Sequence, residues 1–389
     1  MKICACIAEY NPFHFGHLKH INYIKSELGA EKVIVIMSGN FTQRGEIAVL
    51  DKFTRARHAC LAGADLVVEL PTVFATSNAE LFASGAINLI NSLGVIDGVC
   101  FGVESGTKDA YLNLAKAMNN ESKEFKKILK EKLDGGISLA KAKFETACAL
   151  GGEFDPSLLS SPNNVLGLEY TKAILKTNAN LHIFPMIREG DHNDPTLKKG
   201  ITSATSIRRV LKTGKVKKLK KSLPPFVFSD LKNYPLAFEK IALANVVSKS
   251  AEELSTAPDC TEGLENRIKA LVKDNNSYDA LIEKVSTKRY TKTRIQRILT
   301  ASLLGITSNF LFDCLKAPLY AKILAVNTLS KDLIPKICEK ATVPVLTRKS
   351  DCALLKKTAL KCFEKDVLAN DLFSLITNDK INEHQMLLV

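Results

Sequence analysis

The sequence predicts an α/β fold in which a parallel sheet is followed by a mostly helical second domain. Short apolar runs alternate with segments of helical periodicity over residues 1–221. Strands that alternate with helices form parallel sheets through right-handed crossovers. From residue 226 onward the periodicity is nearly all helical. A run of lysines and the pair Pro224-Pro225 separates the two patterns, so we expect domains at 1–221 and 222–389.

The elements of the first domain follow in order. Residues 2–9 form an apolar run that ends in Glu9-Tyr10-Asn11-Pro12, and apolar side chains then recur at helical spacing. Similar runs of strand length indicate a parallel sheet that is covered on both faces. The expected strands are 2–9, 32–37, 66–70, 98–102 and 180–186, and the expected helices are 17–26, 53–62, 80–93, 108–133, 164–176 and 206–212.

The second domain is expected to be a helical bundle. Its apolar residues recur at a spacing of three or four positions, which is typical of amphipathic helices. The expected helices are 237–247, 264–272, 278–283, 292–304, 318–326 and 354–368.

Composition excludes several classes of protein. The chain has 389 residues, 46% of them hydrophobic and 24% charged, which is typical of globular domains. No apolar run approaches the roughly 20 residues that span a bilayer, and Met1 leads directly into a strand-like segment. Ten cysteines are scattered without a CxxC pair, which indicates reduced thiols. We therefore expect a cytoplasmic protein with no membrane partner and no metal site formed by its side chains.

The net charge of +13 raises the question of a polyanionic partner. Such an excess of Lys and Arg favours binding to nucleic acid. A lysine-rich surface without any partner explains the charge equally well. The position of the basic residues along the chain therefore has to distinguish between these two interpretations.

The most informative segment lies where the first strand ends and the first helix begins. Three histidines, His14, His17 and His20, stand there within seven residues, beside Gly16. Helix N-termini at the carboxyl edge of a parallel sheet bind phosphate through backbone amides and the helix dipole. The alternatives are a capped helix start with incidental imidazoles, or a zinc site, for which no nearby Cys or carboxylate completes the ligand set. Phosphate binding is the favoured interpretation.

The segment resembles a known family. His14-x-Gly16-His17 after the first strand is similar to the motif of adenylyltransferases and class I aminoacyl-tRNA synthetases. Longer stretches resemble the bacterial tRNA(Met) cytidine acetate ligase family. These stretches are residues 8–17, 38–45, 63–71, 162–164, 203–208, 262–266 and 288–291.

The resemblance implies both a fold and an activity. It implies a Rossmann-like nucleotidyltransferase domain followed by a helical domain that helps to grip tRNA. Members of the family form acetyl-adenylate from acetate and ATP and acetylate N4 of the wobble cytidine of elongator tRNA(Met). The implied cofactors are ATP and Mg²⁺, and the implied partners are acetate and that tRNA.

Catalytic and ATP-binding residues are expected around this motif and at the ends of the other strands. The catalytic candidates are His14 and His17, which would stabilise charge on the α-phosphate and leaving pyrophosphate, and Asn40 and Arg44 in the loop after the second strand. Thr202 stands where the family resemblance leads us to expect Ser. The candidates for ATP binding are Ile7, Ala8, Glu9, Tyr10, Asn11, Pro12, Phe13, His14, Phe15, Gly16, His17, Leu18, Lys19, His20, Gly39, Gly102, one or both of Asn163 and Asn164, Arg188, Ser203, Thr205 and Arg208.

Two basic clusters form the expected RNA surface. Each cluster alone would also fit an ordinary solvated helix face, but two clusters that follow an expected adenylate-forming domain favour RNA binding. Tyr290 lies inside the second cluster and is expected to stack on a base. The candidates are Arg209, Lys212, Lys217, Lys218, Lys220, Lys221, Lys288, Arg289, Tyr290, Arg294 and Arg297.

Two other functions remain open at this point. A small-molecule adenylyltransferase would explain the histidine motif but not the charge. A non-catalytic RNA-binding protein with nucleotide affinity would explain the charge but needs no catalytic histidines. An aminoacyl-tRNA synthetase is disfavoured, because we find no Lys-Met-Ser-Lys-Ser-like loop.

Overall fold

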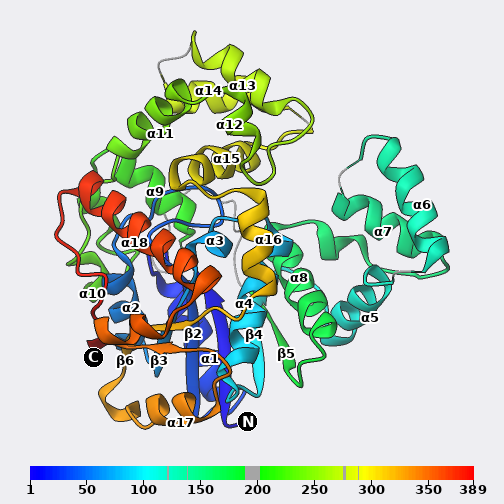
Figure 1. Cartoon of the computed structure of the whole chain (residues 1–389). Coiled ribbons are helices and arrows are strands. Elements are labelled where there is room, and N and C mark those ends of the chain that lie inside the picture. The colour runs from blue at the N-terminus through cyan, green and yellow to red at the C-terminus, as the bar shows by residue number, and fades with distance from the viewer. Residues whose placement is uncertain (121, 138, 189–201, 275–276, 288) are drawn as a thin grey trace.

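The computed structural model describes residues 1–120, 122–137, 139–188, 202–274, 277–287 and 289–389. Within these residues a sheet of eight strands forms the centre, and helices cover both of its faces (Figure 1). Five parallel strands are ordered β5-β4-β1-β2-β3, and β6 then pairs antiparallel with β3. The strands are β1 Ile3–Ala8, β2 Lys32–Ser38, β3 Leu66–Leu70, β4 Gly98–Val103, β5 His182–Ile187, β6 Ala321–Val326, β7 Val345–Leu346 and β8 Leu387–Leu388.

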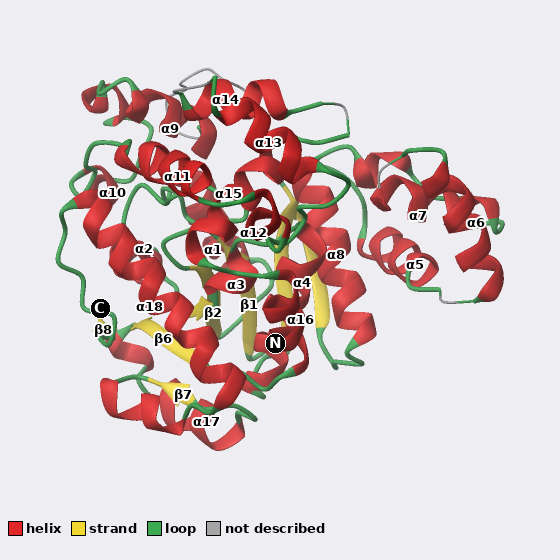
Figure 2. Cartoon of the chain, turned by 45° about the horizontal axis from the view of Figure 1, so that its top comes forward, coloured by secondary structure: helices red, strands yellow, loops and turns green. Residues whose placement is uncertain are grey.

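The helices surround this sheet, and α5, α6 and α7 project from it as a separate lobe (Figures 1 and 2). In the described residues, no single helix is long and apolar enough to cross a membrane. The helices α15 and α16 together have the length and composition of a membrane span, but the pair is bent by 84°. The helices are α1 Phe15–Ser26, α2 Lys52–Leu61, α3 Thr72–Ala75, α4 Ala79–Leu93, α5 Lys108–Met118, α6 Lys123–Asp134, α7 Leu139–Ala149, α8 Pro162–Lys176, α9 Ala204–Lys212, α10 Pro225–Phe228, α11 Ala237–Ser248, α12 Ala251–Ser255, α13 Leu264–Val272, α14 Tyr278–Val285, α15 Lys292–Leu304, α16 Ser308–Lys316, α17 Leu333–Lys340 and α18 Lys357–Thr377. Short 3₁₀ turns are η1 Pro156–Leu159, η2 Val216–Leu219, η3 Thr328–Ser330 and η4 Lys349–Leu354.

Two apolar cores lie on opposite faces of the sheet. Successive side chains of a strand point to opposite faces, so Cys4 and Cys6 of β1 join one core while Ala5 joins the other. Helices α1 and α2 contribute Ile21 and Phe53 to the first core, and α4 and α8 contribute to the second. Because both faces are covered, the strands are mostly apolar, and the charged exceptions include Glu69 of β3 and Lys322 of β6.

The α/β fold class is confirmed, but the prediction of a helix at 318–326 is wrong. Residues Ala321–Val326 form strand β6, and every one of them is buried. A short, mostly apolar run such as this one has the same appearance whether it becomes a buried strand or a buried helix. Pairing with the edge of β3 determines that this run forms a strand, because β6 satisfies the backbone hydrogen bonds there.

Other boundaries differ in smaller ways. The expected helix 108–133 is two helices, since Ser122 caps α6 with a hydrogen bond from the amide of Phe125 at 3.1 Å. The division of the chain at residues 221 and 222 stays a prediction, although β6, β7 and β8 from the second part complete the sheet of the first. The sheet is therefore mixed rather than wholly parallel.

The strand order locates a ligand-binding crevice. From β1 the chain proceeds through β2 to β3 on one side, and then returns to β4 and β5 on the other side. Ligands of open α/β sheets bind outside the carboxyl ends of the strands at such a reversal. The expected crevice lies between the ends of β1 and β4.

Candidate functional site

A cavity of about 650 Å³ lies at this reversal point. Its walls come from the ends of β1 and β4, the loop after β2, and the starts of α1, α8, α9 and α15. The predicted site residues that line it are Ile7, Ala8, Glu9, Tyr10, Asn11, His14, Gly16, His17, Lys19, His20, Arg44, Gly102, Asn163, Arg188, Thr205, Arg208 and Arg297. The predicted residues outside its lining are Pro12, Phe13, Phe15, Leu18, Gly39, Asn40, Asn164 and Ser203.

The two histidines at the start of α1 cap the helix reciprocally. His14 Nδ1 accepts a hydrogen bond from the Gly16 amide at 3.0 Å, and His17 Nδ1 accepts one from the His14 amide at 3.2 Å. The two rings stack with centroids 3.7 Å apart, and Tyr10 packs edge-on against His17. Because an accepting Nδ1 carries no proton, both neutral rings hold their proton on Nε2. The capped-helix alternative and the phosphate interpretation are thus compatible, because these two capping hydrogen bonds use only Nδ1 of each ring.

Glu9 directly follows β1 and lies near the charges of Arg44 and Arg208. Its Oε1 accepts a hydrogen bond from the Gln43 amide at 2.6 Å. Burial raises the pKa of Glu9, and the Gln43 hydrogen bond and the charges of Arg44 and Arg208 oppose this rise. Arg208 in turn pairs with Glu46, with Nε and Oε2 3.1 Å apart. The carboxyl group is therefore held in place on one oxygen and partly desolvated.

The loop after β2 divides into a part that lines the cavity and a part that is anchored behind it. Asn40 is buried, and its Oδ1 accepts the Lys52 amide at 2.8 Å while its Nδ2 donates to Asn370 at 3.0 Å. A side chain at Gly39 would lie 2.5 Å from Glu69 Oε1. These residues position the loop, and Gln43 and Arg44 carry it to the cavity.

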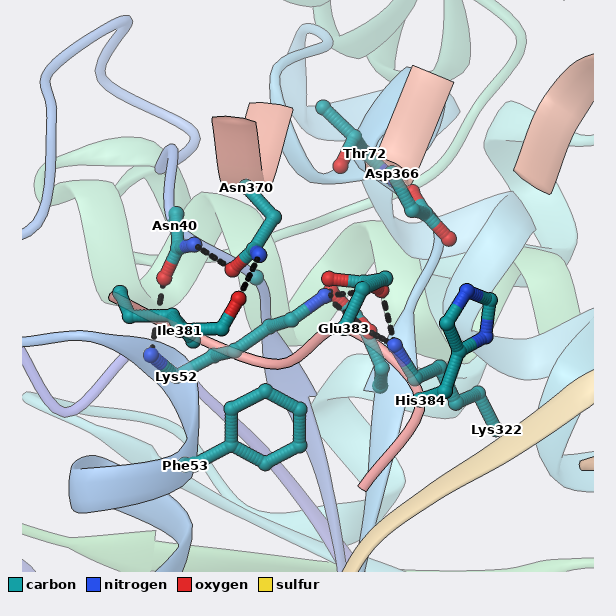
Figure 3. Close-up of polar contacts among 12 residues, drawn as sticks. Asn40, Lys52, Phe53, Thr72, Lys322, Asp366, Asn370, Ile381, Glu383 and His384 are labelled. Carbon is teal, nitrogen blue, oxygen red and sulfur yellow. Dashed lines mark hydrogen bonds and ion pairs between the residues drawn. The ribbon is translucent and has the colours of Figure 1, made fainter. Parts of the chain in front are cut away.

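The anchor is a buried cluster of charges (Figure 3). The ammonium group of Lys52 contacts Glu69 and Glu383, each at 2.7 Å, and Lys322 pairs with the same two carboxylates. All four side chains are at most 5% exposed. Buried charges persist only when they are paired, so this cluster, hereafter the lysine cluster, joins α2, β3, β6 and the C-terminal segment.

Asp366 of α18 adds a third carboxyl group beside the lysine cluster. It accepts hydrogen bonds from the Thr72 amide at 2.7 Å and from the Tyr320 hydroxyl. Complete burial and the nearby charge of Glu69 raise the pKa of Asp366 to about 7. The residue therefore binds a proton much more readily in the folded protein than in an unfolded chain.

On the other side of the crevice, Gly102 makes room for an arginine. A side chain at Gly102, which lines the cavity, would lie 2.9 Å from Cδ of Arg188, so the glycine leaves space for this arginine. Burial lowers the pKa of His20 to about 4, with a further contribution from Arg188, and His20 Nε2 lies 3.2 Å from the Cys100 sulfur. His20 is thus a neutral wall of the cavity.

The structure distinguishes the two asparagines at the start of α8. Asn164 is fully buried; it accepts the Glu104 amide at 2.8 Å and donates to Ser105 at 2.9 Å and to the Ser157 carbonyl at 2.7 Å. Asn163 lines the cavity and donates to the Glu104 carboxylate at 2.7 Å. Asn163 is therefore the one placed to contact a ligand.

A similar division holds at α9. Ser203 caps the helix by accepting the Ser206 amide at 3.2 Å, while Thr205 lines the cavity. Arg208 is 8% exposed, lines the cavity and donates to the Asn11 carbonyl at 2.9 Å. It thereby links α9 to the segment that leads into α1.

Helix α15 brings the second half of the chain to the same cavity. Thr291, Thr293 and Arg297 line it, and Arg297 is held by Asp259 with an Nη2 to Oδ2 distance of 3.2 Å. Arg297, expected on the RNA surface, is thus a cavity residue. The link is tight at Gly45, where a side chain would lie 2.4 Å from the backbone nitrogen of Arg297.

Sequence reasoning missed the apolar and α15 walls of the cavity. The apolar residues are spread over six elements and each one has the pattern of an ordinary core residue, so no signal in the sequence distinguishes them. Gln43, Pro162 and Thr291 lie inside the family-like stretches 38–45, 162–164 and 288–291, so the sequence offered a signal for these three. The missed lining residues are Gln43, Ala79, Phe82, Phe101, Leu159, Ser160, Ser161, Pro162, Val165, Leu166, Tyr170, Met186, Ala204, Thr291 and Thr293.

The remaining basic candidates lie outside the cavity lining. Arg209, Lys212, Lys217, Lys218, Lys220 and Lys221 are exposed on α9, η2 and the turns that follow them. Arg289 pairs with Glu262, and Arg294 lies over the Tyr290 ring at 5.2 Å. Lys288 lies outside the described residues.

The lining of the cavity fits a nucleoside triphosphate better than it fits a metal ion held by side chains. Five cationic side chains, Lys19, Arg44, Arg188, Arg208 and Arg297, are among its described lining residues. In that part of the chain no three His, Cys, Asp or Glu residues are arranged to hold a metal. Mg²⁺ prefers oxygen ligands, and Glu9 is the one carboxylate among the described lining residues. The donor set therefore does not fit a side-chain Mg²⁺ site.

Comparison with known proteins agrees with this picture. Residues 1–387 match the family model described as HIGH Nucleotidyl Transferase. The tRNA(Met) cytidine acetate ligase of Clostridium novyi is 37% identical over 393 residues, covering 97% of this chain and 96% of that protein. The corresponding ligase of Acetivibrio thermocellus is 36% identical over 398 residues, covering 96% and 94%.

Two solved structures share the whole fold. The crystal structure of Thermotoga maritima TmcAL bound with alpha-thio ATP superposes with a TM-score of 0.91 at 29% identity, and each chain covers 100% of the other. The apo form of the same protein gives a TM-score of 0.94 at 29% identity, again over 100% of both chains.

Proposed function

Since this chain belongs to the HIGH nucleotidyl transferase family, and within it to the tRNA(Met) cytidine acetate ligases, we propose that it acetylates tRNA with acetate and ATP. In this proposal it forms acetyl-adenylate and transfers the acetyl group to N4 of the wobble cytidine of elongator tRNA(Met). The observation that carries the proposal is the cationic cavity at the strand reversal, with the His14 and His17 pair at the helix start beside it.

The first half-reaction depends on positioning and charge. His14 and His17 donate from Nε2 to the α-phosphate, where negative charge accumulates as pyrophosphate leaves. The start of α9, with Thr205 and Arg208, binds the phosphates that leave. Arg44 faces the cavity from the opposite loop and attracts the acetate carboxylate. Mg²⁺ would enter this reaction together with ATP rather than through a site formed by side chains.

The second half-reaction needs an acceptor that reaches the same cavity. The exposed lysines of α9 and η2 adjoin the cavity through Arg208, which supports their role in holding the tRNA backbone. Thr291 and Thr293 of α15 bring the second domain to the cavity mouth, where the wobble base would enter. The acetyl-adenylate stays enclosed until the amine attacks, so hydrolysis is limited.

The test is acetate-dependent exchange of pyrophosphate into ATP, followed by acetylation of elongator tRNA(Met). His14→Ala should lower the exchange rate by about 100-fold or more, as for loss of one transition-state donor. Lys336→Ala, in an exposed i,i+4 pair with Asp332 on α17, is the matched control and should keep the wild-type rate. An exchange rate that does not depend on acetate but increases with another acceptor would favour a small-molecule adenylyltransferase. Binding of tRNA with no exchange at all would favour the non-catalytic alternative.

A further inference from the structure

We propose that Glu9 is the general base that accepts the proton from the cytidine N4 amine during acetyl transfer. The inference rests on the proposed function and assigns a role in its second half-reaction. It starts from the composition of the cavity wall, where Glu9 is the single carboxylate among the described residues. The five cationic side chains of the wall can bind the phosphates, whereas a carboxylate would repel them. Glu9 therefore has a role other than phosphate binding.

An exocyclic amine of a base needs such a group. Its lone pair attacks the acetyl carbon and forms the C–N bond, and the bond from that carbon to the phosphate oxygen breaks as AMP leaves with the electron pair. The amine nitrogen must then lose a proton. In this mechanism the Glu9 carboxylate takes that proton and later releases it to water. Proton transfer of this kind contributes about 10² to 10⁴ in rate.

The geometry of Glu9 suits this task. It stands at the end of β1, five positions before His14, so it lies at the carboxyl edge where the adenylate phosphate is expected. The hydrogen bond from the Gln43 amide at 2.6 Å engages Oε1 and orients the carboxylate. The second oxygen is the one that receives the proton.

The surroundings of Glu9 act on its basicity in opposite directions. Burial raises its pKa, and Glu46 acts in the same direction. Arg44 of the same loop and Arg208 of α9 act against this rise. Arg55 of α2 also faces this charge, and Tyr170 of α8 faces it from the other wall. Burial makes this carboxylate a stronger base than an exposed one, and the two guanidinium groups favour its ionised form.

The competing explanation is that Glu9 only anchors the loop through Gln43. The substitution Glu9→Gln separates the two, because the amide oxygen still accepts the Gln43 hydrogen bond but the side chain no longer takes a proton. Glu9→Asp keeps the carboxylate on a shorter side chain. Glu169→Gln is the matched control, since Glu169 is also buried with a raised pKa but pairs with Lys172 outside the cavity lining.

The experiment supplies acetyl-adenylate directly and follows single-turnover acetylation of elongator tRNA(Met) between pH 5 and pH 8. The wild-type rate should rise tenfold per pH unit at low pH and then level off. Glu9→Gln should be slower by about 100-fold or more and lack that rise, while Glu9→Asp and Glu169→Gln keep it. A Glu9→Gln rate within about threefold of wild type, or one with the wild-type rise, would overturn the proposal.

Failure of the proposed function gives a different result. If the wild-type protein shows no acetate-dependent exchange yet acetylates tRNA from added acetyl-adenylate, the activation step is wrong and the role of Glu9 is still measured. If the wild-type protein transfers nothing from acetyl-adenylate, both the transfer reaction and its base are rejected.

Discussion

At the scale of single residues, neighbouring side chains of the same type have different tasks. Asn163 and Asn164 are adjacent and chemically identical, yet one lines the cavity and the other is enclosed by three hydrogen-bond partners. Ser203 and Thr205 divide in the same way between capping α9 and facing the cavity. A motif therefore marks a site without saying which of its members touch the ligand.

Substitution of the two asparagines tests this division. Asn164→Ala leaves buried polar partners unpaired and should lower the free energy of unfolding by about 3 kcal/mol. Asn163→Ala loses one partly buried hydrogen bond, so it should cost about 1 kcal/mol while raising the KM for ATP about tenfold. Urea unfolding and steady-state kinetics measure the two effects. Equal stability losses in the two variants would contradict the assignment.

The histidine pair shows what geometry adds to a motif. The spacing of His14 and His17 allows both rings to reach one ligand, but the tautomer depends on the backbone donors that each Nδ1 accepts. Those donors exist only because residues 15–26 form α1. The helix start thus determines which nitrogen of each ring caps the backbone.

At the scale of elements, the loop between β2 and α2 joins the two halves of the chain. The Thr300 hydroxyl of α15 donates to the Gly45 carbonyl at 2.8 Å, and Gly45 has a φ of +71°. A β-carbon there would meet the backbone of Gln296 and Arg297 at 2.4 Å. Close backbone contact of this kind cannot be relieved by a rotamer change.

Replacing Gly45 with alanine should therefore be costly. The left-handed backbone conformation contributes about 1 kcal/mol and the contact with α15 about 1 to 3 kcal/mol more. Gly29→Ala is the matched control, because Gly29 has a φ of +63° and nothing lies within 4 Å of the added carbon. Thermal or urea unfolding should show the larger loss for Gly45→Ala. Identical losses would mean that the loop adapts without strain.

At the scale of the whole molecule, the lysine cluster connects segments that are distant in sequence. Lys52 and Glu383 are separated by 331 positions but form a 2.7 Å contact. The Asn370 amide continues the connection by donating to the Ile381 carbonyl at 3.0 Å (Figure 3). The C-terminal segment thereby supports the loop that carries Gln43 and Arg44.

Asp366 makes the stability of this arrangement depend on pH. Its folded pKa of about 7 lies above the unfolded value of about 3.9, so the folded state holds the proton more tightly between these values. The contribution is fully present below about pH 4 and is lost as the pH rises through 7, by up to about 4 kcal/mol. The wild-type protein should therefore lose stability relative to Asp366→Asn across this window.

Urea unfolding of both proteins from pH 4 to pH 8 measures that difference. Asp371→Asn is the matched control, since Asp371 lies on the same helix but is exposed. Its difference from wild type should stay flat with pH. A flat difference for Asp366→Asn as well would show that Asp366 ionises as freely in the folded protein as in the unfolded chain.

The sequence by itself determined the α/β class, the strands β1 to β5 and the segment that opens the cavity, because these depend on local periodicity and on a compact motif. It also identified the family, through stretches that recur along most of the chain. Cytoplasmic location, the RNA surface and the domain boundary stay predictions.

Only the tertiary structure decided the identity of β6, the separate tasks of Asn163 and Asn164, and the contribution of α15 to the cavity. An apolar run such as 321–326 carries no information about which backbone will pair with it. Likewise, Phe101 and Tyr170 become cavity walls only when β4 and α8 meet at the strand reversal. Contacts between distant segments depend on the packing of the whole chain, which local patterns do not contain.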